Sequence, residues 1–455
     1  MPTDLSKIKN IVVVMAENRS FDHMLGYLSL PPSNRNDVDG LRVEQDWLAR
    51  FTNYDKGKAY HPIPGEDPYT MPNDFDPPHE RPNVADNLGP LQDTTYAMNG
   101  FVRSIPASVS EDPAVRRLVM SYFSPAQAPM NDFFSRHYAI CDRWFSSLPA
   151  GTQPNRLMSM SGYSLIEVNH DVLPEHYLVY DWLTDRRVSW RVYHQGVPFF
   201  IMMPRWLPEA LLSNHFRSFS DLEGDLMSTP PDQFPQVIFV EPTYQDAPHL
   251  GWSTDAHAPS GISNGQEFLM EVYNAVTNSP AFWRGAVMIV DYDEHGGFFD
   301  HVSPPMIRTD VPANATYNTP FVSLGVRIPN YVISPFVRAG SVNHALLDHT
   351  SVLKLIGEKF GPNGSYSTLV DARSVESVSS VLDFDIPIAS PPSAPALNDY
   401  LARRGPAPVG ATVPAQNTKL QSGFQKAVSN LKQQGADASH PKFGKLLEAM
   451  AKPAV

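Results

Sequence analysis

The sequence predicts an α/β protein whose central sheet is mostly parallel and covered by helices on both faces. Four short runs are almost continuously hydrophobic, which is typical of strands that are buried on both faces of a sheet. Long mixed segments separate these runs, and one of them, residues 346–361, has amphipathic helical spacing and ends at Gly361. This alternation is typical of a parallel sheet with helical connections. The four runs are residues 8–15 (IKNIVVVM), 188–193 (VSWRVY), 236–240 (QVIFV) and 285–290 (GAVMIV).

Polar side chains follow each of the four predicted strands. In open α/β sheets the carboxyl ends of parallel strands meet at one edge, and ligands bind there. We therefore expect a functional site at this edge. The side chains in question are Glu17 and Asn18 after the first run, His194 after the second, Glu241 after the third, and Asp291, Asp293 and Glu294 after the fourth.

Proline defines the organisation of the rest of the chain. The 44 prolines, about twice the usual frequency, are densest in residues 62–90 and 387–414. Because proline lacks a backbone donor and fixes its own φ, we expect residues 62–90 to hold no helix or central strand and to form an ordered loop over the site. The pattern predicts a main domain over residues 1–385, a proline-rich linker over 386–414 and a helical tail over 415–455.

Composition excludes several classes of function. The formal net charge is −13 and no cluster of Lys and Arg occurs, which excludes nucleic-acid binding and disfavours tight adsorption to anionic lipid. Brief contact with a membrane or micelle surface stays compatible with this charge. Cys141 is the only cysteine, so an intrachain disulfide is excluded. The apolar run before Met15 is too short for a signal peptide, so we expect either a cytoplasmic location or export by a signal-independent route.

Carboxylate and amide oxygens at the predicted strand ends indicate a metal site. Glu17, Asn18, Asp293 and Glu294 form an oxygen-rich set that suits a hard divalent cation, whereas one cysteine cannot build a thiolate site. The alternative is that acidic residues beside glycines only form turns, and for one motif alone the two interpretations are about equal. Their occurrence at several strand ends favours the metal site.

The segment SSLPAGTQPNRLMSMSGYS, residues 146–164, places the hydroxyl of Thr152 just before a helical start. A hydroxyl in this position is often a simple N-cap, and in isolation that interpretation is favoured. The functional interpretation is a nucleophile whose substrate lies at the amino end of the helix. The spacing of residues in this segment does not distinguish the N-cap from the nucleophile.

Five motifs occur in a fixed order along residues 17–353: ENRSFDH, TQPNR, VEPTY, DEHGGFFDHV and DHTSVL. Together they resemble the phosphoesterase family of non-specific phospholipases C and acid phosphatase A type enzymes. The resemblance implies an alkaline phosphatase-like fold, a three-layer α/β/α sandwich, with residues 1–385 as the phosphoesterase catalytic domain. It also implies that Arg19, Asp22 and His23 hold the turn that carries the metal ligands.

The resemblance assigns roles to individual residues. The nucleophile position of the family corresponds to Thr152. The active-site histidines of the family correspond to His79, His194 and His257, and the match of His257 is the most secure. One divalent metal ion is implied, with Ca²⁺ favoured by the all-oxygen ligands and Mg²⁺, Mn²⁺ and Zn²⁺ as alternatives. The implied ligands are Glu17, Asn18, Thr152, Asp293 and Glu294.

The implied function is a non-specific phospholipase C that cleaves glycerophospholipids to diacylglycerol and a phosphorylated head group through a phosphothreonine. A broad acid phosphatase acting on soluble phosphomonoesters is the alternative on the same site. A third class, a non-catalytic metal-stabilised binding protein, is disfavoured because a nucleophile and both acidic pairs are present. The expected partners are a phospholipid or small phosphoester and a transient membrane or micelle surface, without nucleic acid and with the oligomeric state left open.

Overall fold

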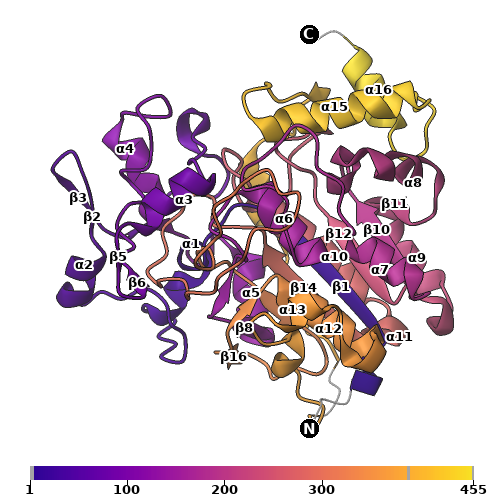
Figure 1. The fold of residues 1–455 in the computed structure, drawn as a ribbon, viewed down its shortest axis with the longest axis horizontal. Coiled ribbons are helices and arrows are strands. Elements are labelled where there is room, and N and C mark those ends of the chain that lie inside the picture. The colour runs from indigo at the N-terminus through magenta and orange to yellow at the C-terminus, as the bar shows by residue number, and fades with distance from the viewer. Residues whose placement is uncertain (1–4, 387–389, 453–455) are drawn as a thin grey trace.

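The computed structural model describes residues 5–386 and 390–452. An eight-stranded sheet crosses the molecule in the order β11-β10-β12-β1-β14-β15-β8-β16 (Figure 1). Only β15 runs antiparallel to its neighbours in this sheet, so the prediction of a mostly parallel sheet is confirmed. The strands are β1 (Asn10–Ala16), β8 (Ala139–Cys141), β10 (Trp190–His194), β11 (Phe216–Ser218), β12 (Val237–Glu241), β14 (Ala286–Tyr292), β15 (Tyr331–Ile333) and β16 (Val342–Asn343).

The four predicted strands lie side by side as β10, β12, β1 and β14, each within two residues of its expected start. Their Val and Ile side chains suit strand geometry, and every residue of β1, β12 and β14 is buried. Val13 pairs in parallel register with Phe239 on one side and Ile289 on the other. The carboxyl ends of these strands therefore share one edge of the sheet.

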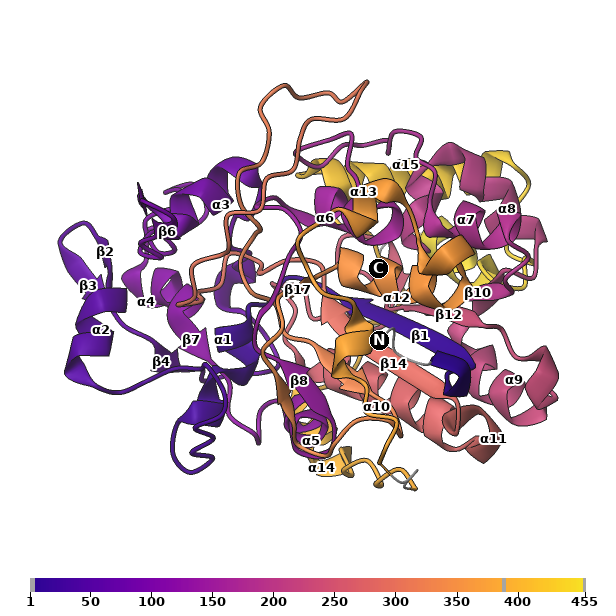
Figure 2. The same ribbon diagram turned by 60° about the horizontal axis from the view of Figure 1, so that its bottom comes forward.

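Helices cover both faces of the sheet, which confirms the three-layer sandwich (Figure 2). The helices on one face are α6 (Thr152–Ser161), α7 (Val179–Asp185) and α12 (Thr350–Phe360). The helices on the other are α5 (Pro129–His137), α9 (Leu222–Ser228), α10 (Ser263–Thr277) and α11 (Pro280–Trp283). Along the described residues, no helix combines the length and the apolar character needed to cross a membrane.

Residues 45–122 form a lobe beside the sheet, coloured indigo to purple in Figure 1. Its apolar centre is a separate cluster that includes Phe75, Val84 and Phe101. The expectation that residues 62–90 hold no helix is wrong, because α3 (Arg81–Leu88) forms with its proline in the first turn, where a missing N–H costs nothing. The lobe also carries α2 (Gln45–Phe51), β2 (Asn53–Asp55), β3 (Lys58–Tyr60), β4 (Ile63–Pro64), β5 (Leu91–Gln92), β6 (Thr95–Tyr96), α4 (Pro113–Arg116) and β7 (Ser121–Tyr122).

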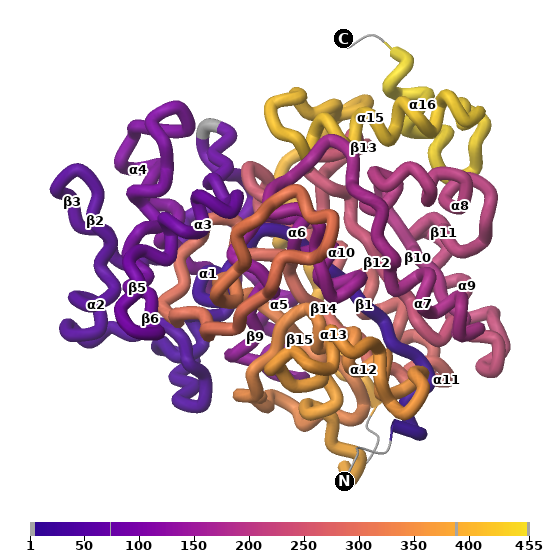
Figure 3. The backbone as a smooth tube through the Cα atoms, in the orientation of Figure 1, coloured from indigo at the N-terminus to yellow at the C-terminus, as the bar shows by residue number. Residues whose placement is uncertain are grey.

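The C-terminal segment packs on the main domain. The predicted linker carries α14 (Asn398–Leu401) and β18 (Ala411–Thr412), and β18 pairs antiparallel with β13 (His249–Leu250). The predicted tail carries α15 (Lys419–Gln433) and α16 (Gly444–Ala451), which lie beside β13 and α8 in Figure 3. Residues 387–389 of the linker and 453–455 of the tail lie outside the described residues, and the division at residues 385 and 414 stays a prediction. The remaining elements are α1 (Phe21–Leu25), β9 (Trp144–Phe145), α8 (Leu207–Leu212), β17 (Leu347–Asp348) and α13 (Thr368–Asp371).

Candidate active site

The turn after β1 is held against the turn after β14. Asn18 has a φ of 62°, a left-handed conformation that is uncommon outside glycine and is often found at functional sites. The Asn18 N–H donates to Asp293 Oδ1 at 3.1 Å, and the Arg19 N–H donates to the Glu294 carbonyl at 3.1 Å. These bonds place Glu17 and Asn18 beside Asp293 and Glu294, as the shared sheet edge predicts.

A glycine in DEHGG makes this approach possible. Gly296 has a φ of 62°, and a Cβ on it would lie 2.3 Å from the Asn18 carbonyl oxygen. The Gly296 N–H also donates to Glu294 Oε2 at 2.8 Å, which fixes the orientation of that carboxylate. The motif therefore needs glycine here for both its backbone conformation and its lack of a side chain.

Thr152 is the first residue of α6, and its N-cap is Gly151. The interpretation of Thr152 as an N-cap is therefore wrong, and its buried Oγ1 has no hydrogen-bond partner among the described residues. Asn155 shapes the loop before the helix, because its Nδ2 donates to the carbonyls of Leu148, Ala150 and Gly151. This leaves the threonine hydroxyl free for another role.

Arg156 follows Thr152 by one helical turn and lies on the same face of α6. Its Nη2 lies 2.9 Å from Glu17 Oε1, and its Nε lies 3.8 Å from Asp293 Oδ2. All three side chains are buried. Arg156 thus joins α6 to the ends of β1 and β14. Arg156 was not among the predicted functional residues, although its place in TQPNR, four residues after the hydroxyl, was the available signal.

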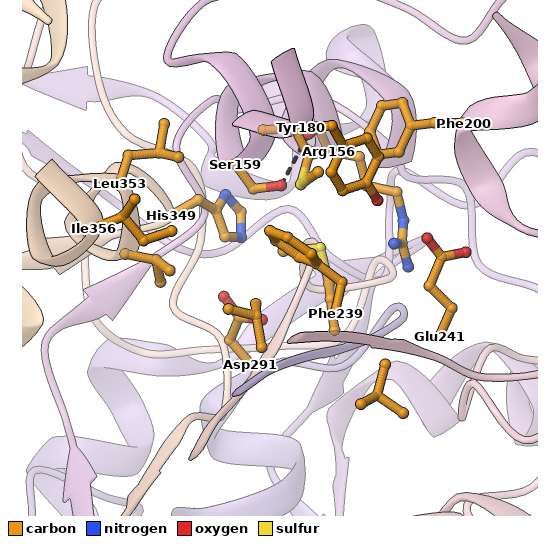
Figure 4. A pocket seen from close by; sticks show the side chains of 15 residues that line it. Arg156, Ser159, Tyr180, Phe200, Phe239, Glu241, Asp291, His349, Leu353 and Ile356 are labelled. Carbon is orange, nitrogen blue, oxygen red and sulfur yellow. Dashed lines mark hydrogen bonds between the residues drawn. The ribbon is translucent and has the colours of Figure 1, made fainter. Parts of the chain in front are cut away.

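A small cavity of about 40 Å³ lies between α6, α12 and the sheet. In Figure 4, Asp291 and Glu241 line it and the Arg156 guanidinium faces the Glu241 carboxylate. Burial raises the pKa of Asp291 well above its usual range and that of Glu241 to about 7. Burial alone would lower the pKa of Arg156, but Tyr244 and the carboxylates around the guanidinium raise it. The Arg156 guanidinium is therefore the positive charge that lies among these carboxylates at the carboxyl edge of the sheet.

Buried oxygen atoms without a hydrogen-bond partner among the described residues gather at this edge: both oxygens of Asp291, one of Asp76, and five on other residues. A buried polar atom without a partner costs about 1–3 kcal/mol, so five unpartnered oxygens imply a ligand that is not part of the chain. Oxygen atoms of carboxylates, an amide and a hydroxyl fit a hard divalent cation. The five are Glu17 Oε2, Asn18 Oδ1, Thr152 Oγ1, Asp293 Oδ2 and Glu294 Oε1. They come from the five residues predicted as metal ligands.

Two of the predicted histidines lie at the same site. His257 Nδ1 lies 3.2 Å from Glu17 Oε2, and its Nε2 lies 3.5 Å from Asp76 Oδ1. His79 Nε2 lies 3.2 Å from Asn18 Nδ2, and the rings of His79 and His257 are 5.6 Å apart. Buried groups of Asp, Glu and His that could hold a metal ion therefore occur here, and His257 belongs to two of them.

Burial and neighbouring charged side chains set the pKa values of Glu17 and His79. Burial alone would raise the pKa of Glu17, but the neighbouring Arg156 and His257 side chains lower it. Burial alone would lower the pKa of His79, but Glu294 and Asp76 raise it to about 9. The site thus stabilises ionised carboxylate at Glu17 and protonated imidazole at His79.

His194 lies apart from these two histidines. Its Nδ1 is 2.6 Å from the Gly196 carbonyl, and its ring stacks on Phe443 of the tail at 5.5 Å between centroids. Burial lowers its pKa to about 4. The structure therefore groups His194 with the C-terminal tail, and its active-site role stays a prediction.

The remaining residues of ENRSFDH hold the turn in place. Arg19 donates from Nε to the Ala256 carbonyl at 2.8 Å and from Nη2 to the Ser260 carbonyl at 3.0 Å. It thereby joins the turn after β1 to the loop that carries His257. His23 Nδ1 lies 2.7 Å from the Ser121 carbonyl. Sequence reasoning missed two acidic residues of this site, Asp76 and Asp246, because loops without periodicity carry them.

The family match defines the class of protein: the chain belongs to the Phosphoesterase family, whose sequence model matches residues 8–362. Non-specific phospholipase C1 of Arabidopsis thaliana is 30% identical over 387 residues, which cover 80% of this chain and 69% of the relative. Phospholipase C B of Mycobacterium tuberculosis is 29% identical over 439 residues, which cover 85% of this chain and 80% of the relative. Among solved structures, a protein of the alkaline phosphatase superfamily from Vibrio parahaemolyticus matches with a TM-score of 0.36 and 9% identity, covering 94% of this chain and 88% of that one.

Proposed function

We propose that this chain is a metal-dependent non-specific phospholipase C that cleaves glycerophospholipids to diacylglycerol and a phosphorylated head group. The observation that carries the proposal is the set of five unpartnered buried oxygens, because one of them is the Thr152 hydroxyl at the amino end of α6. A hydroxyl beside metal-ligating carboxylates is an activated nucleophile. The names of the plant and mycobacterial relatives support a phospholipid as the substrate.

Four residues besides Thr152 would hold one divalent cation: Glu17, Asn18, Asp293 and Glu294. When bound, this ion would supply Lewis-acid stabilisation of the charge on the phosphoryl oxygens and favour loss of the hydroxyl proton. The all-oxygen set favours Ca²⁺, with Mg²⁺, Mn²⁺ and Zn²⁺ as alternatives.

Thr152 Oγ1 attacks the phosphorus atom, and the bond from phosphorus to the diacylglycerol oxygen breaks. The product of this step is a phosphothreonine that still carries the head group. His257 or His79 donates a proton to the departing oxygen, since both imidazoles lie beside the metal-ligating carboxylates. The proton lost by Thr152 passes to solvent water. In the second step the imidazole that protonated the departing oxygen takes a proton from an attacking water, the phosphorus–Oγ1 bond breaks, the phosphorylated head group leaves, and Thr152 regains a proton from solvent.

The amino end of α6 and the neighbouring cations assist this step. Backbone N–H groups at a helix start attract anions, and the phosphoryl group would lie there. The guanidinium of Arg156 fixes the Glu17 carboxylate through a contact of 2.9 Å. Fixed charges of this kind contribute strongly to rate because they need no reorganisation during the reaction.

The second candidate is a broad acid phosphatase that acts on soluble phosphomonoesters. The histidine pair favours it, because the raised pKa of His79, about 9, keeps an imidazolium available to pair with the phosphate of a monoester. The same nucleophile and the same ligand set would serve both reactions. Only the leaving group differs.

The test measures hydrolysis of phosphatidylcholine micelles and of p-nitrophenyl phosphate by the wild type, Thr152→Val and chelator-treated protein. Thr152→Val keeps the shape of the side chain but removes the nucleophile, so both activities should fall by at least about 10³-fold. Thr277→Val, on α10 across the sheet, is the matched control and should retain full activity. Cleavage of the soluble ester alone would replace the phospholipase proposal with the phosphatase, and full activity of Thr152→Val would refute both.

A further inference from the structure

We propose that the C-terminal helix α15 is part of the working active site, with Gln421 as a positioning residue that orients His257 through Asp246. The inference rests on the proposed function for its kinetic readout. The Phosphoesterase profile ends at residue 362, so α15 lies outside the part of the chain that the family match covers.

The tail is firmly attached to the main domain at the place where it meets the site. Leu420, Phe424, Val428 and Leu431 form the buried face of α15. The β18 and β13 pair ties the segment before the helix to the loop between β12 and α10. That loop also carries His257. The start of α15 is therefore held close to the active-site histidine.

A polar relay leads from the helix to the metal ligands. Gln421 Nε2 donates to Asp246 Oδ1 at 2.8 Å. The other oxygen of the same carboxylate, Oδ2, lies 3.6 Å from His257 Nδ1, which in turn lies 3.2 Å from Glu17 Oε2. Asp246 and His257 are 5% and 1% exposed. Because one carboxylate oxygen faces Gln421 and the other faces His257, the amide sets the rotation of the Asp246 carboxylate.

An apolar contact reinforces the relay from the next turn of α15. The Phe424 ring stacks on Tyr244 at 5.5 Å between centroids and meets Phe199 edge-on at 5.7 Å. The Arg156 guanidinium lies 4.9 Å from the Tyr244 ring centre and 4.5 Å from that of Phe199. These rings form one side of the Arg156 environment, so α15 supports both Arg156 and His257, the two side chains that contact Glu17.

Gln421 has two separable contacts, which makes the proposal testable. Its Oε1 accepts from the Thr418 N–H, and its own N–H donates to Thr418 Oγ1, a capping box at the start of α15. A capping box works equally with Glu or Gln at this position. Gln421→Glu therefore keeps the acceptor that caps the helix and replaces the donor to Asp246 with a second carboxylate, so the Asp246 carboxylate must turn away. Thr418→Ala does the reverse, because it removes the cap hydroxyl and keeps the amide of Gln421.

The experiment measures kcat, KM and the thermal midpoint of the full-length, metal-loaded protein on whichever phosphoester the wild type hydrolyses. Gln421→Glu is expected to lower kcat by about tenfold with less than about a twofold change in KM, because orientation affects the chemical step. Thr418→Ala is expected to lower the midpoint and leave kcat unchanged. Equal loss of kcat in both variants, or none in Gln421→Glu, would overturn the positioning role.

A double-mutant cycle tests the route through Asp246. In an Asp246→Asn background, Gln421→Glu should change kcat by less than about twofold, since the partner through which it acts is already altered. An undiminished tenfold effect in that background would refute the relay. The His257 ring signal in the NMR spectrum of histidine-labelled protein gives a readout without turnover, and it should shift in Gln421→Glu but not in Thr418→Ala. A wild type that hydrolyses neither substrate would refute the proposed function alone, and an unshifted His257 signal would refute the relay alone.

Discussion

Arg156 Nη2 lies 2.9 Å from Glu17 Oε1, and both side chains are buried. The pair joins the first turns of α6 to the end of β1, so the helix that carries the hydroxyl and the strand that carries the carboxylate have a fixed relative position. A buried ion pair of this kind contributes little net stability, but removal of one partner is costly.

Replacing Arg156 with Gln leaves Glu17 and Asp293 without their buried counter-charge. We expect a loss of about 3–5 kcal/mol in the free energy of unfolding in metal-free protein, and a smaller loss when a divalent cation is bound. Urea unfolding with and without a chelator measures both. Arg308→Gln is the matched control, since Arg308 pairs with Asp310 on the surface and such pairs are worth at most about 1 kcal/mol. Similar losses in the two variants would contradict the role of Arg156.

Removal of the metal should destabilise the fold. Binding of an ion to the folded state at a hundred times its Kd adds about 2.7 kcal/mol, so the thermal midpoint should fall on chelation and recover with added divalent cation. Asp293→Asn should abolish this recovery, whereas Asp232→Asn, at an exposed position, should not. Differential scanning calorimetry measures the midpoint. A midpoint that is insensitive to chelation in the wild type would argue against a resident ion.

Substitution of Gly296 with Ala should disrupt the metal ligands. The added Cβ would lie 2.3 Å from the Asn18 carbonyl oxygen, and φ at this position is 62°, so the turns after β1 and β14 must separate. We expect loss of metal affinity, measured by isothermal titration, and reduced stability. Gly224→Ala serves as the control, because no atom lies within 4 Å of its added Cβ and an alanine within α9 stabilises by about 0.5–1 kcal/mol.

His301 should make stability depend on pH. Its Nδ1 lies 2.7 Å from Asp22 Oδ2 and its Nε2 lies 3.1 Å from Asp39 Oδ1. Burial alone would lower the pKa of His301, but these carboxylates raise it to about 9. A pKa raised above the unfolded value of about 6.5 means that the stabilisation is complete below pH 6.5 and is lost as pH rises through 9.

The variant His301→Gln should therefore cost most at pH 6, on the order of 3 kcal/mol, and progressively less toward pH 10. Urea unfolding at several pH values measures this difference. His215→Gln, which removes a partly exposed contact with Glu209, should show no comparable trend. A cost of His301→Gln that is constant between pH 6 and pH 10 would contradict the ionised cluster.

Sequence reasoning found the strands and the gathering of oxygen-bearing side chains at one sheet edge for one physical reason. The hydrophobic runs are local signals, and a parallel sheet necessarily gathers their carboxyl ends. Glu17, Asn18, Asp293 and Glu294 follow directly from that rule. Thr152 needed the family resemblance, because a hydroxyl before a helix is usually a cap; only the structure shows that Gly151 takes that position.

Residues on irregular segments could not be predicted in the same way. Asp246 and Asp76 reach His257 from loops, and Gln421 reaches Asp246 across 175 positions of the chain. No periodicity in the sequence encodes such contacts. The helix α3 was missed for the opposite reason, since proline was counted against a helix without regard to its position in the first turn.

The position of β1 in the sheet has a consequence for synthesis of the chain. This strand is made before both of its partners, β12 and β14, which begin more than two hundred residues later. A ribosome adding about 5–20 residues per second needs tens of seconds to reach them. During that interval an apolar, β-branched segment waits without a partner. The nascent chain is therefore expected to depend on chaperones that shield its amino end until the middle of the sheet can assemble.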